Sequence, residues 1–143
     1  MNTAQEPSAR FTVRRSTAWL VGATFVLVFA AFAVGISDNP PGIALLYGAG
    51  LTGVLVVTHR WRNPHNFGYL LLTAIVGFFL MVLIHNFAEV GAERISHLPV
   101  LALPLTAISV VGFVAAVILC PAAGVVGFLG WIATVGRRSQ HTT

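Results

Sequence analysis

The sequence predicts an all-α membrane protein, an antiparallel four-helix transmembrane bundle with its N- and C-termini in the cytoplasm. Of the 143 residues, 57% are hydrophobic and only 8% are charged, whereas a soluble domain carries about 25% charged residues. Four long apolar stretches, separated by short polar segments, account for this composition. A soluble fold of this length could not hide so much apolar surface, because much of the surface of a small domain faces water.

The arginines predict how the four spans are oriented. Positively charged residues are retained on the cytoplasmic side during membrane insertion. All eight basic residues are arginines, and only Arg94 lies outside the gaps before the first stretch, between the second and third, and after the fourth. We therefore expect both termini and the central loop to be cytoplasmic. We expect the bacterial inner membrane as the location.

The tryptophans support the same orientation. Trp19, Trp61 and Trp131 all fall at the expected cytoplasmic boundary, where an indole can combine an apolar body with one hydrogen-bond donor. With the neighbouring arginines they form a predicted layer of headgroup contacts. Its members are Arg14, Arg15, Trp19, Arg60, Trp61, Arg62, Trp131, Arg137 and Arg138.

Residues 1–15 are expected to form a cytoplasmic tail, and residues 16–36 the first span. A helix of about 21 residues rises about 31 Å, which matches the hydrocarbon thickness of a bilayer. Arginines, an apolar run and the sequence Ala31-Phe32-Ala33 also resemble a cleavable signal peptide. Of the two interpretations we favour an uncleaved signal anchor.

A turn with two prolines, residues 37–42, leads to the second span, which we expect at residues 43–58. Prolines and short polar residues are typical of a tight connection. Small residues recur at every fourth position of this span, a pattern that lets helix backbones approach closely. We expect the helix at the centre of the packing. Its predicted packing residues are Gly48, Ala49, Thr52 and Gly53.

Asn63 followed by Pro64 is a typical N-cap and first helical position, and predicts a third span over residues 64–88. The fourth apolar stretch, residues 98–135, is nearly twice as long as a bilayer requires. It could be two spans hinged at Cys120-Pro121. No polar turn interrupts it, so we expect one tilted span over residues 104–135, kinked near Pro121.

Gly124 and Gly127 in the fourth stretch favour close helix packing, although a discontinuous helix that binds ions through its backbone is an alternative. Residues 137–143 are expected to be a second cytoplasmic tail. The predicted organisation is therefore one transmembrane domain over residues 16–136, flanked by two tails.

The sharpest polar cluster lies near the outer end of the third span and comprises His85, Asn86, Glu89 and Glu93. His85 and Glu89 are four residues apart and share a helix face. An imidazole and a carboxylate at this spacing can offer two ligands to a metal ion. The alternatives are an interfacial helix end with a polar pair and a polar contact with a partner subunit.

The leading functional prediction is a non-catalytic accessory or structural subunit that packs against a larger membrane complex. The spans contain no set of nucleophile, base and orienting group and no central carboxylate of the kind that proton-coupled transporters use. One alternative is a small homo-oligomeric channel or transporter with a polar entrance at His85, Asn86 and Glu89. Another is a protein that binds a metal or haem.

The expected partners are membrane lipids and other membrane subunits or further copies of the chain. Nucleic acid is not expected, because the arginines form no basic stripe with interleaved aromatics. The residues require no cofactor, and a single cysteine, Cys120, excludes a disulfide within the chain.

Overall fold

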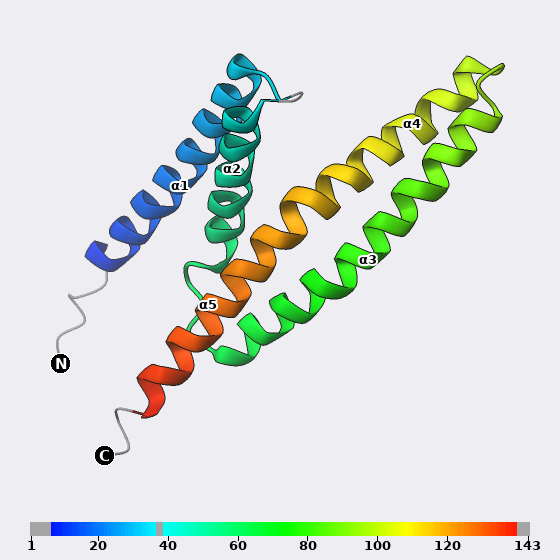
Figure 1. Cartoon of the computed structure of the whole chain (residues 1–143). Coiled ribbons are helices and arrows are strands. Elements are labelled where there is room, and N and C mark those ends of the chain that lie inside the picture. The colour runs from blue at the N-terminus through cyan, green and yellow to red at the C-terminus, as the bar shows by residue number, and fades with distance from the viewer. Residues whose placement is uncertain (1–6, 37–38, 140–143) are drawn as a thin grey trace, which may run out of the picture. The chain divides into compact units, whose positions relative to one another are not determined.

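The computed structural model describes residues 7–36 and 39–139, and these are helical apart from short connections (Figure 1). The elements are α1 (Pro7–Val34), α2 (Pro40–Thr58), α3 (Pro64–Arg94), α4 (Pro99–Val114), the π-helix η1 (Ala115–Leu119) and α5 (Cys120–Ser139). They contain four helical stretches that are long and apolar enough to cross a membrane. The all-helical class and these four apolar spans agree with the prediction.

The chain divides into two compact units, Met1–Arg60 and Trp61–Thr143. The first contains α1 and α2, and the second contains α3, α4, η1 and α5. Each unit has its own helix–helix contacts, and each is described by itself below.

A tight reversal of the chain joins the helices of the first unit. Gly35 has a φ of 92°, a left-handed conformation that glycine adopts without steric cost. Its N–H donates to the Ala31 carbonyl at 3.0 Å, which closes the end of α1. A Cβ atom on Gly42 would overlap the Gly35 carbonyl oxygen. Glycine at position 42 therefore lets the start of α2 lie against the end of α1.

Helix α2 begins at Pro40 rather than at the predicted residue 43. Proline fits the first turn of a helix, because the N–H that it lacks has no acceptor there. Asn39 precedes it, and its Nδ2 donates to the Val34 carbonyl at 2.9 Å. Residues 37–38 of the predicted turn lie outside the described residues.

Helices α1 and α2 lie side by side along their length (Figure 1). The Thr24 hydroxyl donates to Thr52 Oγ1 at 3.0 Å, and Thr17 Oγ1 lies 3.2 Å from His59 Nε2. The side chain of Ala49 is buried, with 3% of its surface exposed. Small and hydroxyl-bearing residues thus line the contact and allow the two backbones to approach.

The second unit opens with the predicted helix start. The Asn63 side chain accepts a hydrogen bond from the His65 N–H at 3.2 Å, and Pro64 follows as the first helical residue. Helix α3 continues past the predicted end at Ala88 to Arg94, over 31 residues. It is about 46 Å long, longer than the roughly 30 Å hydrocarbon core of a bilayer.

The long apolar stretch that follows forms one continuous helical run, and its candidate span is Pro99–Arg137. The structure therefore has one helix here and not the alternative of two spans hinged at Cys120-Pro121. The helix begins at Pro99 rather than at the predicted Pro104, and Pro99 occupies the first helical position, to which proline is well suited. Pro104 is tolerated inside α4 with the loss of one backbone hydrogen bond.

The disturbance predicted near Pro121 takes the form of η1. The Cys120 N–H donates to the Ala115 carbonyl, five residues back instead of four, which widens the turn. Pro121 comes immediately afterwards and supplies no N–H of its own. Such wide single turns occur mostly inside α-helices.

The core of the second unit is a seam of small residues between α3 and the long α4–η1–α5 helix. Ala74, Ala116 and Ala122 are buried in it. A Cβ atom on Gly127 would lie 2.9 Å from the Leu71 backbone nitrogen, so glycine at this position lets the two backbones pack closely. A Cβ atom on Gly112 would lie 3.3 Å from the His85 nitrogen. This second approach brings α4 against the part of α3 that carries the predicted polar cluster.

Candidate functional site

His85 projects from α3 towards α4. Its Nδ1 lies 3.0 Å from the Ser109 carbonyl oxygen and 2.9 Å from Ser109 Oγ. A carbonyl oxygen only accepts hydrogen bonds, so this contact requires a hydrogen on Nδ1. In the neutral ring, Nε2 is then an acceptor, and its lone pair points away from the Ser109 carbonyl.

Glu89 lies next to the free side of the His85 ring. Glu89 Oε2 is 3.5 Å from His85 Nε2, as expected for residues one helical turn apart. The His85 side chain is 24% exposed and that of Glu89 is 55% exposed. His85 is half-buried and Glu89 is exposed, so the pair is open to other molecules.

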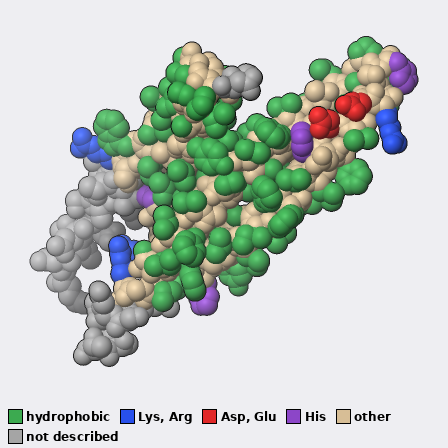
Figure 2. Space-filling view, in the orientation of Figure 1, with side chains coloured by type: hydrophobic (Ala, Val, Ile, Leu, Met, Phe, Trp, Pro, Cys, Tyr) green, Lys and Arg blue, Asp and Glu red, His purple; other side chains and the backbone are tan. Residues whose placement is uncertain are grey.

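These two side chains line a groove between the end of α3 and the start of α4. The groove has a volume of about 870 Å³, and Glu93, Thr106, Ser109 and Phe113 also contribute to its walls. The Phe113 ring lies 5.3 Å from the His85 ring, measured between centroids. Figure 2 shows the acidic side chains of the described residues together near the end where α3 meets α4. Imidazole, carboxylates, hydroxyls and an apolar wall therefore surround one space.

The predicted cluster is divided by the structure. His85, Glu89 and Glu93 line the groove, whereas Asn86 does not and donates from Nδ2 to the Val82 carbonyl at 2.7 Å. Asn86 is one residue from His85 and so is rotated about 100° around the helix. The Asn86 side chain therefore forms its hydrogen bond within α3.

Sequence reasoning missed the contribution of α4 to the site. Thr106, Ser109 and Phe113 have spacings of three and four residues, which place them on one helix face. Two hydroxyls on one face of an otherwise apolar helix were a usable signal. The partner of that face could not be read from the sequence, because Ser109 follows His85 by 24 residues.

The described residues contain no group of three or more His, Cys, Asp or Glu side chains placed to hold a metal ion. His85 and Glu89 together offer two ligands, with Nδ1 of the ring held by a backbone carbonyl. A hydrogen bond from the other ring nitrogen to a carbonyl, like the one between His85 Nδ1 and Ser109, usually orients a metal-binding histidine. A stable site would need further ligands from water or from another chain.

The predicted packing residues lie in contacts within each unit. A Cβ atom on Gly48 would lie 3.5 Å from Leu27 Cδ1, and one on Gly53 would lie 3.8 Å from Thr24 Cγ2. In the second unit, a Cβ atom on Gly124 would lie 4.0 Å from the Ala74 Cβ. The small residues thus pack helices of the same chain against one another.

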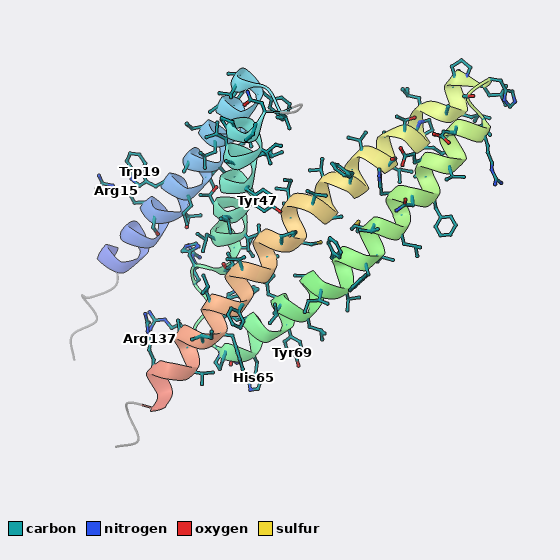
Figure 3. The ribbon with its side chains drawn as sticks, in the orientation of Figure 1. Arg15, Trp19, Tyr47, His65, Tyr69 and Arg137 are labelled. Atoms are coloured by element: carbon teal, nitrogen blue, oxygen red, sulfur yellow. The ribbon has the colours of Figure 1, made fainter. Side chains whose placement is uncertain are left out.

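The predicted headgroup residues gather at one end of each unit. In Figure 3, Arg15 and Trp19 project from the early part of α1, while His65 and Tyr69 lie at the start of α3. Arg137 lies near the end of α5, at the same end of the second unit (Figure 3). Several of these side chains are exposed, namely Arg15, Trp19, Arg60, Arg62, Trp131 and Arg137.

Trp61 is half-buried, and its ring packs edge-on against Phe67 with 5.5 Å between centroids. Arg14 and Arg138 belong to the same predicted layer, but their side chains are not among those that the structure describes.

The sequence matches no protein-family model, no curated protein and no solved structure.

Proposed function

We propose that this protein is a non-catalytic accessory subunit of a larger complex in the bacterial inner membrane. The observation that supports the proposal is a ridge of phenylalanines on α1. Phe25, Phe29 and Phe32 are 61%, 72% and 68% exposed, and their spacings of four and three residues put them on one helix face. We define these three residues as the aromatic ridge. In the complex, a transmembrane helix of another subunit packs against this ridge.

The internal use of polar groups supports the same proposal. Thr24 and Thr52 bond to one another, and Thr134 donates to the Gly130 carbonyl of its own helix at 2.7 Å. Such hydrogen bonds satisfy the hydroxyl groups within the protein and leave none of them as an unpaired polar group in the membrane. In an accessory subunit, these inner surfaces maintain the fold, and the aromatic ridge makes the external contact.

We further propose that the four spans form an antiparallel bundle with both termini in the cytoplasm. The support is the distribution of charge and indole. Arg15 and Trp19 lie at one end of the first unit, and Arg137 lies at one end of the second, with Trp131 in the same half of α5. If both ends lie at the cytoplasmic interface of the membrane, the arginines are on the side that they prefer and the tryptophans are at the interface that they prefer.

Co-purification tests the accessory role. The protein is extracted from native membranes in a mild detergent and analysed by native mass spectrometry. We expect it to carry other subunits, and we expect Phe29→Ala to release them. Phe79→Ala is the matched control, because Phe79 is 67% exposed but belongs to α3. A chain that is recovered only as copies of itself would contradict the proposal.

The groove favours a second candidate, a small homo-oligomeric channel or transporter. Its polar side chains, His85, Glu89 and Glu93, lie at the end of the unit remote from Arg137. These three side chains would form the entrance, whereas Asn86, the fourth residue of the predicted entrance, does not line the groove. Vesicles reconstituted with the protein are expected to pass ions, and His85→Ala is expected to change that flux. Equal flux in protein-free vesicles would remove this candidate.

A further inference from the structure

The groove between α3 and α4 has an excess of negative charge. Glu89 and Glu93 both line it, and His85 is the only basic side chain among its lining residues. Arg94 follows Glu93 in the chain, yet it does not line the groove. Carboxylates in a concave site with low-dielectric walls attract cations.

The His85–Glu89 pair offers two acceptor atoms to a hydrogen-bond donor when the imidazole ring is neutral. Because Nδ1 donates to the Ser109 carbonyl, Nε2 of the neutral ring is an acceptor. It faces Glu89 Oε2, a second acceptor, at 3.5 Å. In the neutral ring these two acceptors repel unless a hydrogen lies between or beside them, and either protonation of the ring or a bound cation supplies that hydrogen. An ammonium group carries several donors and a positive charge, and so satisfies both atoms.

The other walls of the groove are apolar. Leu103, Val110 and Phe113 line it on the α4 side, and the face of a phenyl ring also attracts cations. The volume of about 870 Å³ lies within the range of sites that take small organic molecules, roughly 300–1,000 Å³. The groove therefore has room for a hydrocarbon body attached to the cationic group.

The groove also lies at a suitable height for such a molecule. From Pro64 to His85, α3 rises about 32 Å, close to the thickness of the hydrocarbon core. If α3 enters the core near Pro64, the carboxylates meet the polar boundary and Val110 and Phe113 meet the acyl region. An amphiphile with an ammonium headgroup occupies both zones.

We propose that this groove binds an alkylammonium group. The ammonium donates to Glu89 and to His85 Nε2, and the hydrocarbon lies against Val110 and Phe113. The chemistry is shared by the ethanolamine headgroup of a membrane lipid and by a free organic amine. The proposal stands on the groove alone and requires neither of the functions proposed above.

Native mass spectrometry of the full chain in an uncharged detergent tests the proposal with octylamine as the probe. Octanol, which has the same tail without the charge, is the control ligand. We expect one octylamine per chain and no comparable binding of octanol. Loss of a charge-assisted contact in Glu89→Gln should weaken octylamine binding about tenfold or more. His97→Gln is the matched control, because His97 is near but does not line the groove.

Equal binding of octanol and octylamine would overturn the proposal, and so would unchanged octylamine binding in Glu89→Gln. Binding of one zinc ion that excludes octylamine and depends on His85 would also overturn it, in favour of a metal site. The comparison of the two probes on the unaltered chain holds even if a variant folds poorly. Competition by phosphatidylethanolamine, but not by phosphatidylglycerol, would assign the amine to a lipid headgroup. Absence of that competition, with octylamine still bound, would assign it to a free amine.

Discussion

At the residue scale, a few positions carry most of the close approaches between helices. Gly42 lies against the Gly35 carbonyl, and Gly127 lies against the backbone of Leu71. Neither position has room for a side chain without movement of a backbone. Other glycines, such as Gly68 and Gly136, have open space around them. Composition alone could not distinguish these groups, because the difference depends on which helix lies opposite.

Gly42→Ala is expected to destabilise the first unit by about 1–3 kcal/mol, the usual cost of overpacking. The added methyl would meet a carbonyl oxygen, which cannot rotate away as a side chain would. The free energy of unfolding in detergent, measured by SDS titration, checks this. Gly68→Ala is the control and should leave stability unchanged or raise it slightly. Equal behaviour of the two variants would refute the prediction.

The Thr24–Thr52 hydrogen bond gives a second expectation at this scale. Thr24→Val keeps the shape of the side chain and removes a hydroxyl that lies 3.0 Å from Thr52 Oγ1 across the helix pair and 2.9 Å from the Leu20 carbonyl oxygen of its own helix. The expected loss is about 0.6 kcal/mol, typical of a hydrogen bond between membrane helices. Thr106→Val is the comparison, because Thr106 donates only within its own helix, to the Ala102 carbonyl. A Thr24 variant as stable as the unaltered protein would show that the contact contributes nothing.

At the element scale, the existence of the four apolar helices could be predicted from hydropathy, whereas only some of their ends, such as Thr58 of α2 and Pro64 of α3, could be predicted. Helix α3 passes Ala88 and reaches Arg94, and α4 starts at Pro99. Hydropathy reports the part of a helix that suits lipid. It does not report the turns that continue beyond the lipid and are stabilised by a neighbouring helix. The groove extends from these extra turns into both predicted spans, and only its α3 side was predicted because hydropathy does not say which helix faces pack together.

Gly127→Leu is expected to separate α3 from α5. Its Cβ would be 2.9 Å from the Leu71 nitrogen, so the two helices must move apart and expose the seam between them. We expect a loss of about 1–3 kcal/mol in SDS unfolding of the full chain. Gly136→Leu, in the same helix but with open space around it, should be close to neutral. Helix propensity favours leucine over glycine in both variants, so equal losses of stability would contradict the packing explanation.

At the scale of the whole molecule, the orientation in the membrane is the feature that most needs a direct test. Charge and indole distribution predict that the start of α3 is cytoplasmic and that the α3–α4 connection is on the other side. The contacts within the chain divide it into two compact units, and the single transmembrane domain over residues 16–136 stays a prediction. Hydropathy marks spans but does not say which spans pack together.

Single cysteines introduced into a Cys120→Ala background provide this test. In intact cells, Ser96→Cys should react with a membrane-impermeant maleimide, and His65→Cys should not. After the cells are opened, both should react, which is the control for accessibility. The opposite pattern would reverse the orientation, and labelling of both in intact cells would rule out the four-span arrangement.

The wide turn η1 has a consequence for the length of the long helix. Seven residues of the long helix are buried or contact α3. Four come before or within η1, namely Leu105, Ser109, Gly112 and Ala116, and three follow it, namely Cys120, Gly124 and Gly127. Their steps are four, three, four, four, four and three residues. A regular seam alternates three and four, so the turn absorbs one surplus residue. Residues 115–119 are therefore where homologous chains can be one residue shorter and still present the same face to α3.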